Sequence, residues 1–494
     1  MTGERLSAAV LARHLDAWHD AGGAGYSALA ARIRALLLDG RLTVGTRVPS
    51  ERALALTLAL GRGMVAAAYE ELCASGHLVR RRGSGTWTTL PAVAGRGPVT
   101  PFAPMSALSV PPTTIDFAHA APEAPAEAVT AAGHEALEAL PAHLSGPGYD
   151  LLGLPVLREA VAGRLTAQGL PTTPDEVMIT AGAQHAHALV VRALVRPGDR
   201  VLLEQPTYPN AIDLVRHASA RGVPVTLDPT AGGVGGDGWD VGVLAAALRE
   251  STPALAYLVP DHQNPTGAVM SASTREAVVA ATRRHGVPLV IDDCLREMWL
   301  DAPPPPPVGA WAASSAGSGD HAPVLTLGSL SKTVWGGLRI GWLRAPRAVL
   351  RRVAAARASD DIATPVLEQL LATALLARLD DLLPARRACF AVRRDHLVAA
   401  LGRALPEWRA PRPSGGLSLW VALGAPQSSA LVESAARHGV RVAAGPRFGT
   451  GGAFEGFLRL PYTQAPDVLD DAVARLAAAW RALESRGAGL TTVV

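Results

Sequence analysis

The chain has 494 residues, 49% of them hydrophobic, and a formal net charge of +3 at pH 7. This length exceeds that of one ordinary domain, so we expect two or three domains, and the near balance of charge argues against a polycation. The three cysteines are scattered without metal-binding spacing, so we expect neither a disulfide framework nor a metal site. The N-terminal residues carry charges throughout and no apolar run reaches membrane-spanning length, which predicts a cytoplasmic protein.

Charge is distributed unevenly along the chain. Residues 1–89 contain eleven arginines and seven acidic residues, which leaves a net charge of +4 on this segment and −1 on the rest. A basic module attached to a nearly neutral body indicates a polyanionic partner.

The basic segment has the pattern of three helices followed by a hairpin. Apolar periodicity predicts a first helix that Gly40 ends, a second that Ser50 caps, and a third that Gly76 ends. Only a few residues separate the second and third helices, as in a helix-turn-helix. Residues 78–88 then predict two short strands around a glycine turn.

This module resembles the winged helix-turn-helix of the GntR regulator family through GYSALAARIRALLLDGRLTVGTRVPSERALA, LGRGMVAAAYEELCASGHL and RRRGSGTWT. The resemblance implies double-stranded DNA as partner and a wing tip at the glycine turn. The predicted DNA-binding residues are Arg52, Arg62, Arg80, Arg81, Arg82, Gly83 and Gly85. The recognition helix departs from the family because it begins Gly61-Arg62-Gly63-Met64, without a Ser cap. Only Arg62 there offers strong hydrogen bonds to base edges, so we expect phosphate contacts to dominate.

Composition divides the rest of the chain. Residues 90–112 are rich in proline and lack any sustained period, which predicts a semi-stiff linker. We therefore expect a DNA-binding module at 1–89, this linker, and a large module at 113–494 with a small C-terminal α/β subdomain from about residue 380. The proline-rich segment 301–322 is predicted to be a surface loop of unknown purpose.

Short apolar runs alternate with helical stretches in the large module. This alternation predicts an α/β doubly wound sheet, in which functional residues gather at the carboxyl ends of the strands. The predicted strands are 177–179, 200–203, 223–226, 255–259, 289–291 and 324–326.

Lys332 follows the last of these runs and is the only lysine in the chain. Arginine serves every other cationic position, but arginine stays protonated, whereas lysine can lose its proton and act as a nucleophilic amine. Lys332 is therefore a candidate for forming a Schiff base, and the alternative is a stray surface lysine.

The other strand ends supply complementary groups. A small-residue turn at 180–184 opens a helix and can cradle a phosphate, and Tyr208 can stack on a flat ligand. Asn264 and Asp292 follow two further strands, and Arg339 lies seven residues after Lys332. Pyridoxal 5′-phosphate uses all of these groups, because its aldehyde takes a lysine and its ring nitrogen pairs with a carboxylate.

From about residue 146 the chain resembles the fold-type I pyridoxal-phosphate enzymes, specifically class I/II aminotransferases, through GYDLLGLPVLREAVAGRL, TAGAQHA, PTYPN, NPTG, SLSK and GLRIGW. The resemblance implies that Lys332 carries the cofactor as a Schiff base, that Asp292 pairs with the ring nitrogen and Asn264 with the 3-hydroxyl, and that Tyr208 stacks on the ring. It also implies a substrate-carboxylate arginine at Arg459. The phosphate is assigned to Gly182, Ala183, Gln184, Ser329, Ser331 and Arg339, with Tyr149 reaching it from the partner subunit.

Cys294 departs from the family pattern, because aminotransferases usually have Tyr at this position beside the 3-hydroxyl. Loss of that phenol would alter the electronics of the cofactor and places full transamination in doubt. Asp293 is expected to cap or pair locally. Five histidines are expected to be satisfied structural residues, namely His143, His185, His187, His262 and His285.

The joined modules resemble the MocR regulators. The resemblance implies a head-to-tail homodimeric transcription factor that binds pyridoxal phosphate and senses either an amino compound anchored by Arg459 or pyridoxal phosphate itself. The signal would reach the DNA-binding heads through the linker. Two alternatives stay open. One is an active amino-acid aminotransferase in which Lys332 is also the general base, and the other is a DNA-binding module with an inactive body.

Overall fold

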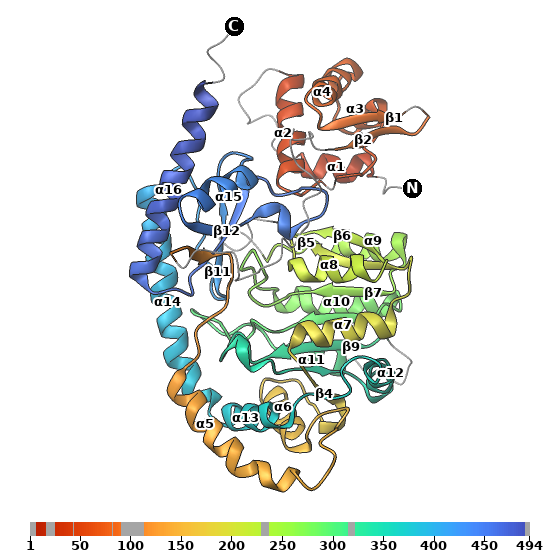
Figure 1. The fold of residues 1–494 in the computed structure, drawn as a ribbon. Helices are drawn as coiled ribbons and strands as arrows, with labels where there is room; N and C mark the ends of the chain where they lie inside the picture. The colour runs from red at the N-terminus through yellow and green to blue at the C-terminus, as the bar shows by residue number, and fades with distance from the viewer. Residues whose placement is uncertain are drawn as a thin grey trace.

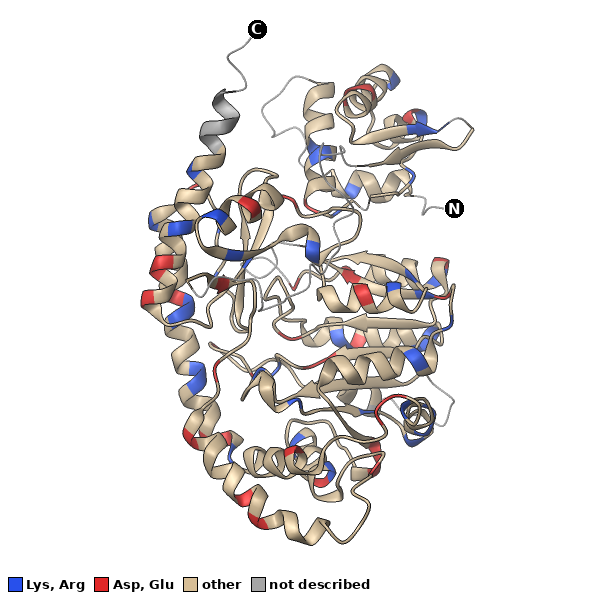
Figure 2. Cartoon of the chain, viewed as in Figure 1, with Lys and Arg blue, Asp and Glu red and all other residues tan. Residues whose placement is uncertain are grey.

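The computed structural model describes residues 6–15, 25–42, 44–81, 83–89, 113–228, 237–314 and 322–489. The predicted linker at 90–112, Arg82 and residues 315–321 of the predicted proline-rich loop lie outside the described residues. Figure 1 shows a small N-terminal head of helices and a β-hairpin standing over the β5–β6 end of a larger α/β body. Acidic and basic residues are spread over both parts (Figure 2).

The head is a helix-turn-helix with a β-hairpin, as predicted. Gly40 and Gly76 end their helices with φ of +69° and +73°, a backbone region that favours glycine. The Ser50 hydroxyl accepts from the Ala53 N–H at 3.2 Å and so caps its helix. Helix α1 was not predicted. The elements are α1 (Ala8–His14), α2 (Tyr26–Leu38), α3 (Glu51–Thr57), α4 (Arg62–Ala74), β1 (Leu78–Arg81) and β2 (Gly85–Thr88).

The body is built on a seven-stranded sheet of order β4-β10-β9-β8-β7-β5-β6. All six predicted strands are present, and the pairs from β6 through β5, β7 and β8 to β9 are parallel. Sequence patterning missed β10, which runs antiparallel between β4 and β9. The strands are β4 (Val177–Thr180), β5 (Arg200–Gln205), β6 (Arg221–Thr226), β7 (Leu255–Leu258), β8 (Leu289–Asp292), β9 (Val324–Ser329) and β10 (Gly341–Arg344).

Helices pack on both faces of this sheet, because its strands are apolar on both sides (Figure 1). The apolar cores on the two faces contain different strand residues, such as Leu203 and Tyr257 on one face and Leu202 and Leu258 on the other. The helices of this part are α5 (Ala126–Ala139), α6 (Pro155–Ala167), α7 (Ala183–Leu194), α8 (Pro209–His217), α9 (Val241–Ser251), α10 (Ala272–Arg284), α11 (Val308–Ser314), α12 (Arg347–Arg357) and α13 (Val366–Ala377).

A smaller four-stranded sheet of order β11-β13-β12-β3 forms the C-terminal subdomain. β3 (Ile115–Phe117) directly follows the predicted linker and pairs in parallel with β12, so the start of the body also belongs to this sheet. The other elements are β11 (Ser418–Ala422), β12 (Val440–Ala444), β13 (Phe457–Pro461), α14 (Leu379–Ala404), α15 (Ser428–Arg437) and α16 (Pro466–Gly489). None of the helices in the described ranges is long and apolar enough to cross a membrane.

Candidate functional site

A cavity of about 340 Å³ lies where the carboxyl ends of the large-sheet strands meet the small sheet. Its wall contains every residue predicted for the cofactor and the substrate except Tyr149, which is 72% exposed. The cavity therefore collects residues that are up to 277 positions apart in the chain, from Gly182 to Arg459. The predicted residues on its wall are Gly182, Ala183, Gln184, Tyr208, Asn264, Asp292, Cys294, Ser329, Ser331, Lys332, Arg339 and Arg459.

Lys332 lies just after β9 with its amine directed at the cavity wall. Its Nζ donates to the carbonyl oxygen of Ala120 at 2.8 Å. Burial lowers the pKa of Lys332 below its usual value, and the nearby Arg459 guanidinium lowers it further. A lower pKa increases the neutral fraction of the amine at a given pH, which is the form that attacks a carbonyl.

Asp292 ends β8 and is held by two donors. Its Oδ2 accepts from the Tyr257 hydroxyl at 2.7 Å, and its Oδ1 accepts from the Cys294 N–H at 3.0 Å. Burial, and then the Asp292 charge, raises the pKa of the Cys294 thiol, which keeps the thiol neutral. The carboxylate is thus oriented before any ligand arrives.

Tyr257 and His187 are cavity residues that sequence reasoning missed. Their rings stack with centroids 4.4 Å apart and an interplanar angle of 6°. Burial lowers the pKa of His187 to about 4, so its imidazole is neutral at pH 7, and its buried Nε2 has no hydrogen-bond partner in the described part of the chain. His187 is therefore not the satisfied structural residue that we expected. Tyr257 was missed because all four residues of β7 are buried, so the strand shows no alternating pattern.

One end of the cavity suits a phosphate group. Gly182 has φ +91° and begins α7 without a side-chain cap, so the helix terminus is open to an anion. Arg339 closes over it, with Nη2 donating to the Ala181 carbonyl at 2.7 Å, and a Cβ on Gly182 would lie 2.8 Å from that nitrogen. The Ser329 and Ser331 hydroxyls lie 3.0 Å apart on the same wall. Glycine, hydroxyls and arginine together form an anion cradle.

The opposite end suits a carboxylate. Arg459 on β13 donates through Nη1 to Asn264 Oδ1 at 3.2 Å and through Nη2 to the Ala118 carbonyl. Its guanidinium carbon lies 4.9 Å from the ring centroid of Phe448, which sequence reasoning also missed. Burial, and then Arg447, lowers the pKa of Arg459 to about 10, and its buried Nε has no partner in the described part of the chain. A buried cation with an unused donor favours an anionic ligand.

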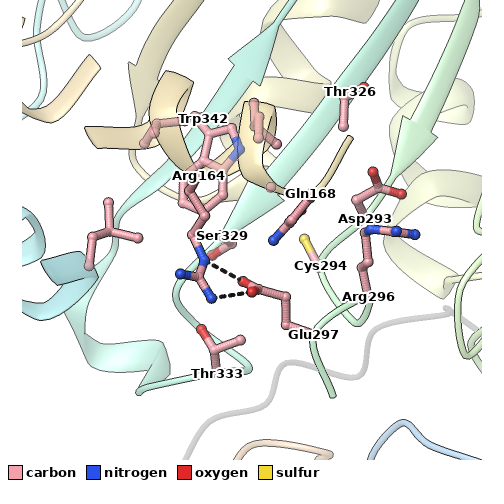
Figure 3. A pocket seen from close by; sticks show the side chains of 14 residues that line it. Arg164, Gln168, Asp293, Cys294, Arg296, Glu297, Thr326, Ser329, Thr333 and Trp342 are labelled. Carbon is pink, nitrogen blue, oxygen red and sulfur yellow. Dashed lines mark hydrogen bonds and ion pairs between the residues drawn. The ribbon is translucent and has the colours of Figure 1, made fainter. Parts of the chain in front are cut away.

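A smaller cavity lies behind Cys294 (Figure 3). Arg164 Nε donates to Glu297 Oε2 at 3.0 Å on its wall. Asp293 also lines it, and both of its carboxylate oxygens are buried without a partner among the described residues. The expected local pairing of Asp293 is therefore wrong. His262 was expected to be a satisfied structural histidine, but both of its ring nitrogens are buried without partners in the described part of the chain.

The predicted DNA-binding arginines that the structure describes lie on the surface of the head. Arg52, Arg62, Arg80 and Arg81 are all exposed, whereas Arg82 lies outside the described residues. Glu51 at the start of α3 pairs with Arg80 at 3.3 Å and with Arg62 at 3.7 Å. Gly83, with φ +73°, lies in the turn of the hairpin, and Gly85, with φ +95°, begins β2.

Two family models match the chain. Residues 116–476 match aminotransferase class I and II, and residues 25–87 match bacterial regulatory proteins of the gntR family. The chain belongs to the class I and II aminotransferase family. Its N-terminal module is a GntR-type helix-turn-helix, so this family member is a transcriptional regulator of the MocR type, as the motifs predicted.

Relatives and solved structures agree with this assignment. The chain is 31% identical over 333 residues to the pyridoxine biosynthesis transcriptional regulator PdxR of Corynebacterium glutamicum, covering 67% of this chain and 68% of that protein. It is 29% identical over 495 residues to the regulator TauR of Rhodobacter capsulatus, covering 92% and 97%. The aminotransferase LysN of Thermus thermophilus, solved with N-(5′-phosphopyridoxyl)-L-leucine, has a TM-score of 0.68 at 28% identity and covers 76% of this chain and 94% of that chain. The predicted fold is confirmed.

Proposed function

We propose that this regulator binds pyridoxal 5′-phosphate covalently at Lys332 and changes its DNA binding when a ligand occupies the same cavity. The observation that carries the proposal is the single cavity that holds the only lysine of the chain between an anion cradle and the half-buried carboxylate of Asp292. The residues fit the cofactor at both ends. Gly182 leaves room beside Arg339 for a phosphate, and Asp292 is oriented for a protonated ring nitrogen.

The protein groups have distinct tasks in this proposal. Lys332 supplies the neutral amine, Asp292 holds the ring nitrogen in its protonated form, and Arg339 with the open end of α7 holds the phosphate. Bound there, the cofactor would supply an aldehyde that reacts with primary amines and a ring that withdraws electrons. Arg459 would take the carboxylate of an incoming amino compound, because its Nε still lacks a partner among the described residues.

The regulator is proposed to act as a homodimer. Tyr149, predicted to reach the partner's phosphate site, is 72% exposed and lies outside this chain's own cavity. An exposed aromatic in that position is available to a second copy. Sedimentation of the purified chain tests this, and Tyr149→Ala should weaken cofactor binding only if a dimer forms.

A working aminotransferase is the second candidate. The observation that favours it is that Lys332, Asp292 and Arg459 share one cavity, which is the set that transamination needs. Cys294 in place of the usual tyrosine favours the regulator. Multiple turnover of an amino acid with a keto acid would establish the enzyme, whereas binding without turnover would establish the sensor.

The primary test is capture of the cofactor. Purified chain mixed with pyridoxal phosphate should gain visible absorbance, and borohydride reduction should fix the added mass on the peptide that contains Lys332. Lys332→Ala should abolish both signals. A wild-type chain that stays colourless after reconstitution would overturn the proposal. Anisotropy with a labelled duplex from the region upstream of the gene, with and without the cofactor, then measures the effect on DNA binding.

A further inference from the structure

The body touches the DNA-binding head directly, at the end of α2. The backbone N–H of Phe454 donates to the carbonyl of Leu38, the last residue of α2, at 2.9 Å. The Gln205 side-chain amide donates to the Gly40 carbonyl at 3.4 Å. Gln205 ends β5, the strand that lies beneath the head in Figure 1. The head is thus bonded to the same sheet that forms the cavity.

Two glycines allow this close approach. Gly40 has φ +69°, and a Cβ built on it would overlap the ring of Phe454. Gly451 has φ +66°, and a Cβ there would lie 2.8 Å from Cβ of Val44 in the head. A side chain at either position would force the two surfaces apart, because interiors as dense as this one have no space to absorb it.

The segment that holds the head continues directly into the wall of the ligand cavity. Phe448 lines the cavity beneath Arg459, six residues before Phe454. The Trp420 indole joins the two rings, with centroids 5.3 Å from Phe448 and 6.0 Å from Phe454. All three rings are buried. The three rings therefore form a continuous packed path from the cavity wall to the contact with the head.

A second path runs through Gln205. Its Oε1 accepts from the Thr450 hydroxyl at 2.7 Å, while its amide holds Gly40. Two residues later in the chain, the Thr207 N–H donates to the Phe448 carbonyl at 2.8 Å, and Tyr208 then lines the cavity. Gln205 therefore bridges the head to the segment that contains Phe448 and Thr450.

Within the head, α2 is tied to the recognition helix α4. Glu71 on α4 accepts from the Ser27 hydroxyl at 3.0 Å and from Arg34 at 3.1 Å, both on α2. Buried apolar side chains of the two helices belong to the same core. A displacement at Leu38 would therefore reposition α4, which carries Arg62 at its start.

We propose that residues 448–454 form a coupling loop that transmits occupancy of the cavity to the head by direct contact. The inference rests on the proposed function. Arg459 donates to Asn264 Oδ1 and to the Ala118 carbonyl. A ligand carboxylate replaces those bonds, which moves the guanidinium off its place above Phe448 and shifts the loop against Leu38 and Gly40. The differential contacts of Arg459 supply the coupling free energy that any such linkage needs.

Hydrogen–deuterium exchange on the full chain tests the contact and the coupling separately. N-(5′-phosphopyridoxyl)-L-leucine serves as the probe, since it carries phosphate, pyridine ring and carboxylate in one stable molecule. In the wild type, the probe should change exchange in peptides covering 445–454 and 36–48 together. Gly40→Ala should keep the response at 445–454 and lose the response at 36–48.

Matched variants separate the contact from backbone strain. Gly45→Ala is the control for Gly40→Ala, because Gly45 is also in the head, has φ +81° and has nothing within 4 Å of its built Cβ. Gly451→Ala should behave like Gly40→Ala, and Gly286→Ala, with the same φ of +66° and open space, should behave like the wild type. Without any probe, exchange at 36–48 should be about tenfold faster in Gly40→Ala than in Gly45→Ala, a change of about 1.4 kcal/mol in local opening.

Each result decides one question. A head that responds equally in Gly40→Ala and the wild type would overturn the coupling loop, as would a response at 445–454 that never reaches 36–48. Equal exchange of Gly40→Ala and Gly45→Ala without probe would overturn the contact itself. A probe that changes nothing in the cavity peptides, together with a chain that does not capture pyridoxal phosphate, would instead overturn the proposed function.

Discussion

The hydroxyl of Tyr257 donates a 2.7 Å hydrogen bond to Asp292 Oδ2, and both side chains line the cavity that holds Lys332. Burial, and then the Asp292 charge, raises the pKa of Tyr257 well above its usual value, so the phenol remains a donor throughout the working pH range. The pair comes from two neighbouring parallel strands, β7 and β8. Tyr257 thus fixes the orientation of the Asp292 carboxyl group on the cavity wall.

Tyr257→Phe should weaken binding of pyridoxal phosphate about tenfold, or about 1.4 kcal/mol, because Asp292 loses one of its two donors. Absorbance titration measures the dissociation constant. Tyr462→Phe is the matched control, since Tyr462 is equally buried. Its hydroxyl donates a 3.1 Å hydrogen bond to the Gly415 carbonyl, and neither residue lines the cavity. Equal affinity of the Tyr257→Phe variant and the wild type would contradict the role given to Tyr257.

Arg459→Gln should shift the pH profile of cofactor capture to higher pH. Burial and then Arg459 lower the pKa of Lys332, and the neutral amine is the reactive form. Removing the guanidinium raises that pKa, so a higher pH is needed to reach the same neutral fraction. Stopped-flow absorbance at a series of pH values gives the midpoint. Arg437→Gln, at an exposed position of α15, should leave the midpoint unchanged, and an unmoved midpoint in Arg459→Gln would refute the prediction.

Asp293→Asn should stabilise the chain at alkaline pH. Burial and then Asp261 raise the pKa of Asp293, so the folded state keeps a proton that the unfolded state loses. The contribution of Asp293 to the free energy of unfolding is therefore present at low pH. It is lost as the pH rises from the pKa of Asp293 in the unfolded chain to its higher pKa in the folded chain. The variant should melt a few degrees above the wild type at pH 8.5, and the difference should shrink near pH 5.

Asp395→Asn provides a control of opposite sign for that experiment. Burial opposes ionisation of Asp395, but hydrogen bonds from Arg394 and Arg412, each 2.8 Å, outweigh it and lower its pKa. Its stabilisation is present above the unfolded pKa and is lost as pH falls through the folded one. Asp395→Asn should therefore lower the melting temperature at pH 8.5. If the melting temperature of the wild type were the same at pH 5 and at pH 8.5, that result would count against a buried, unpaired carboxylate at Asp293.

Glu51→Gln should tighten binding to a mixed-sequence duplex two- to fivefold at low salt. Glu51 pairs with Arg62 and Arg80, two residues predicted to contact DNA, and surface pairs of this kind are worth about 0.2–1 kcal/mol. Removing the carboxylate breaks both pairs and leaves Arg80 only its 3.8 Å pair with Glu70, so both arginines become more available to phosphates. Anisotropy titration measures the affinity, with Glu433→Gln as a control that changes net charge equally on α15 in the body. If Glu51→Gln and Glu433→Gln increase the affinity for DNA equally, the effect comes from net charge and not from the pairs of Glu51 with Arg62 and Arg80.

Much of the fold could be predicted from the sequence, because the apolar patterns and the residues that end or cap helices indicated the same elements. The six predicted strands formed, and Gly40, Ser50 and Gly76 ended or capped helices in the head where expected. β10 was missed because its antiparallel pairing with β4 and β9, and not a pattern of its own, defines it as a strand. β3 joined a sheet whose other strands lie some 300 residues away, which no local signal reports.

By itself the sequence determined the architecture and the candidate chemistry of this protein, because motifs at strand ends place a lysine, a carboxylate and arginines where parallel strands converge. Only the tertiary structure decided which side chains hold those groups. Tyr257 binds Asp292 across two strands, and Arg459 reaches Asn264 from the other sheet. The contact of Phe454 with Leu38 likewise joins residues more than 400 positions apart. Such contacts depend on packing between whole elements, which spacing along the chain does not encode.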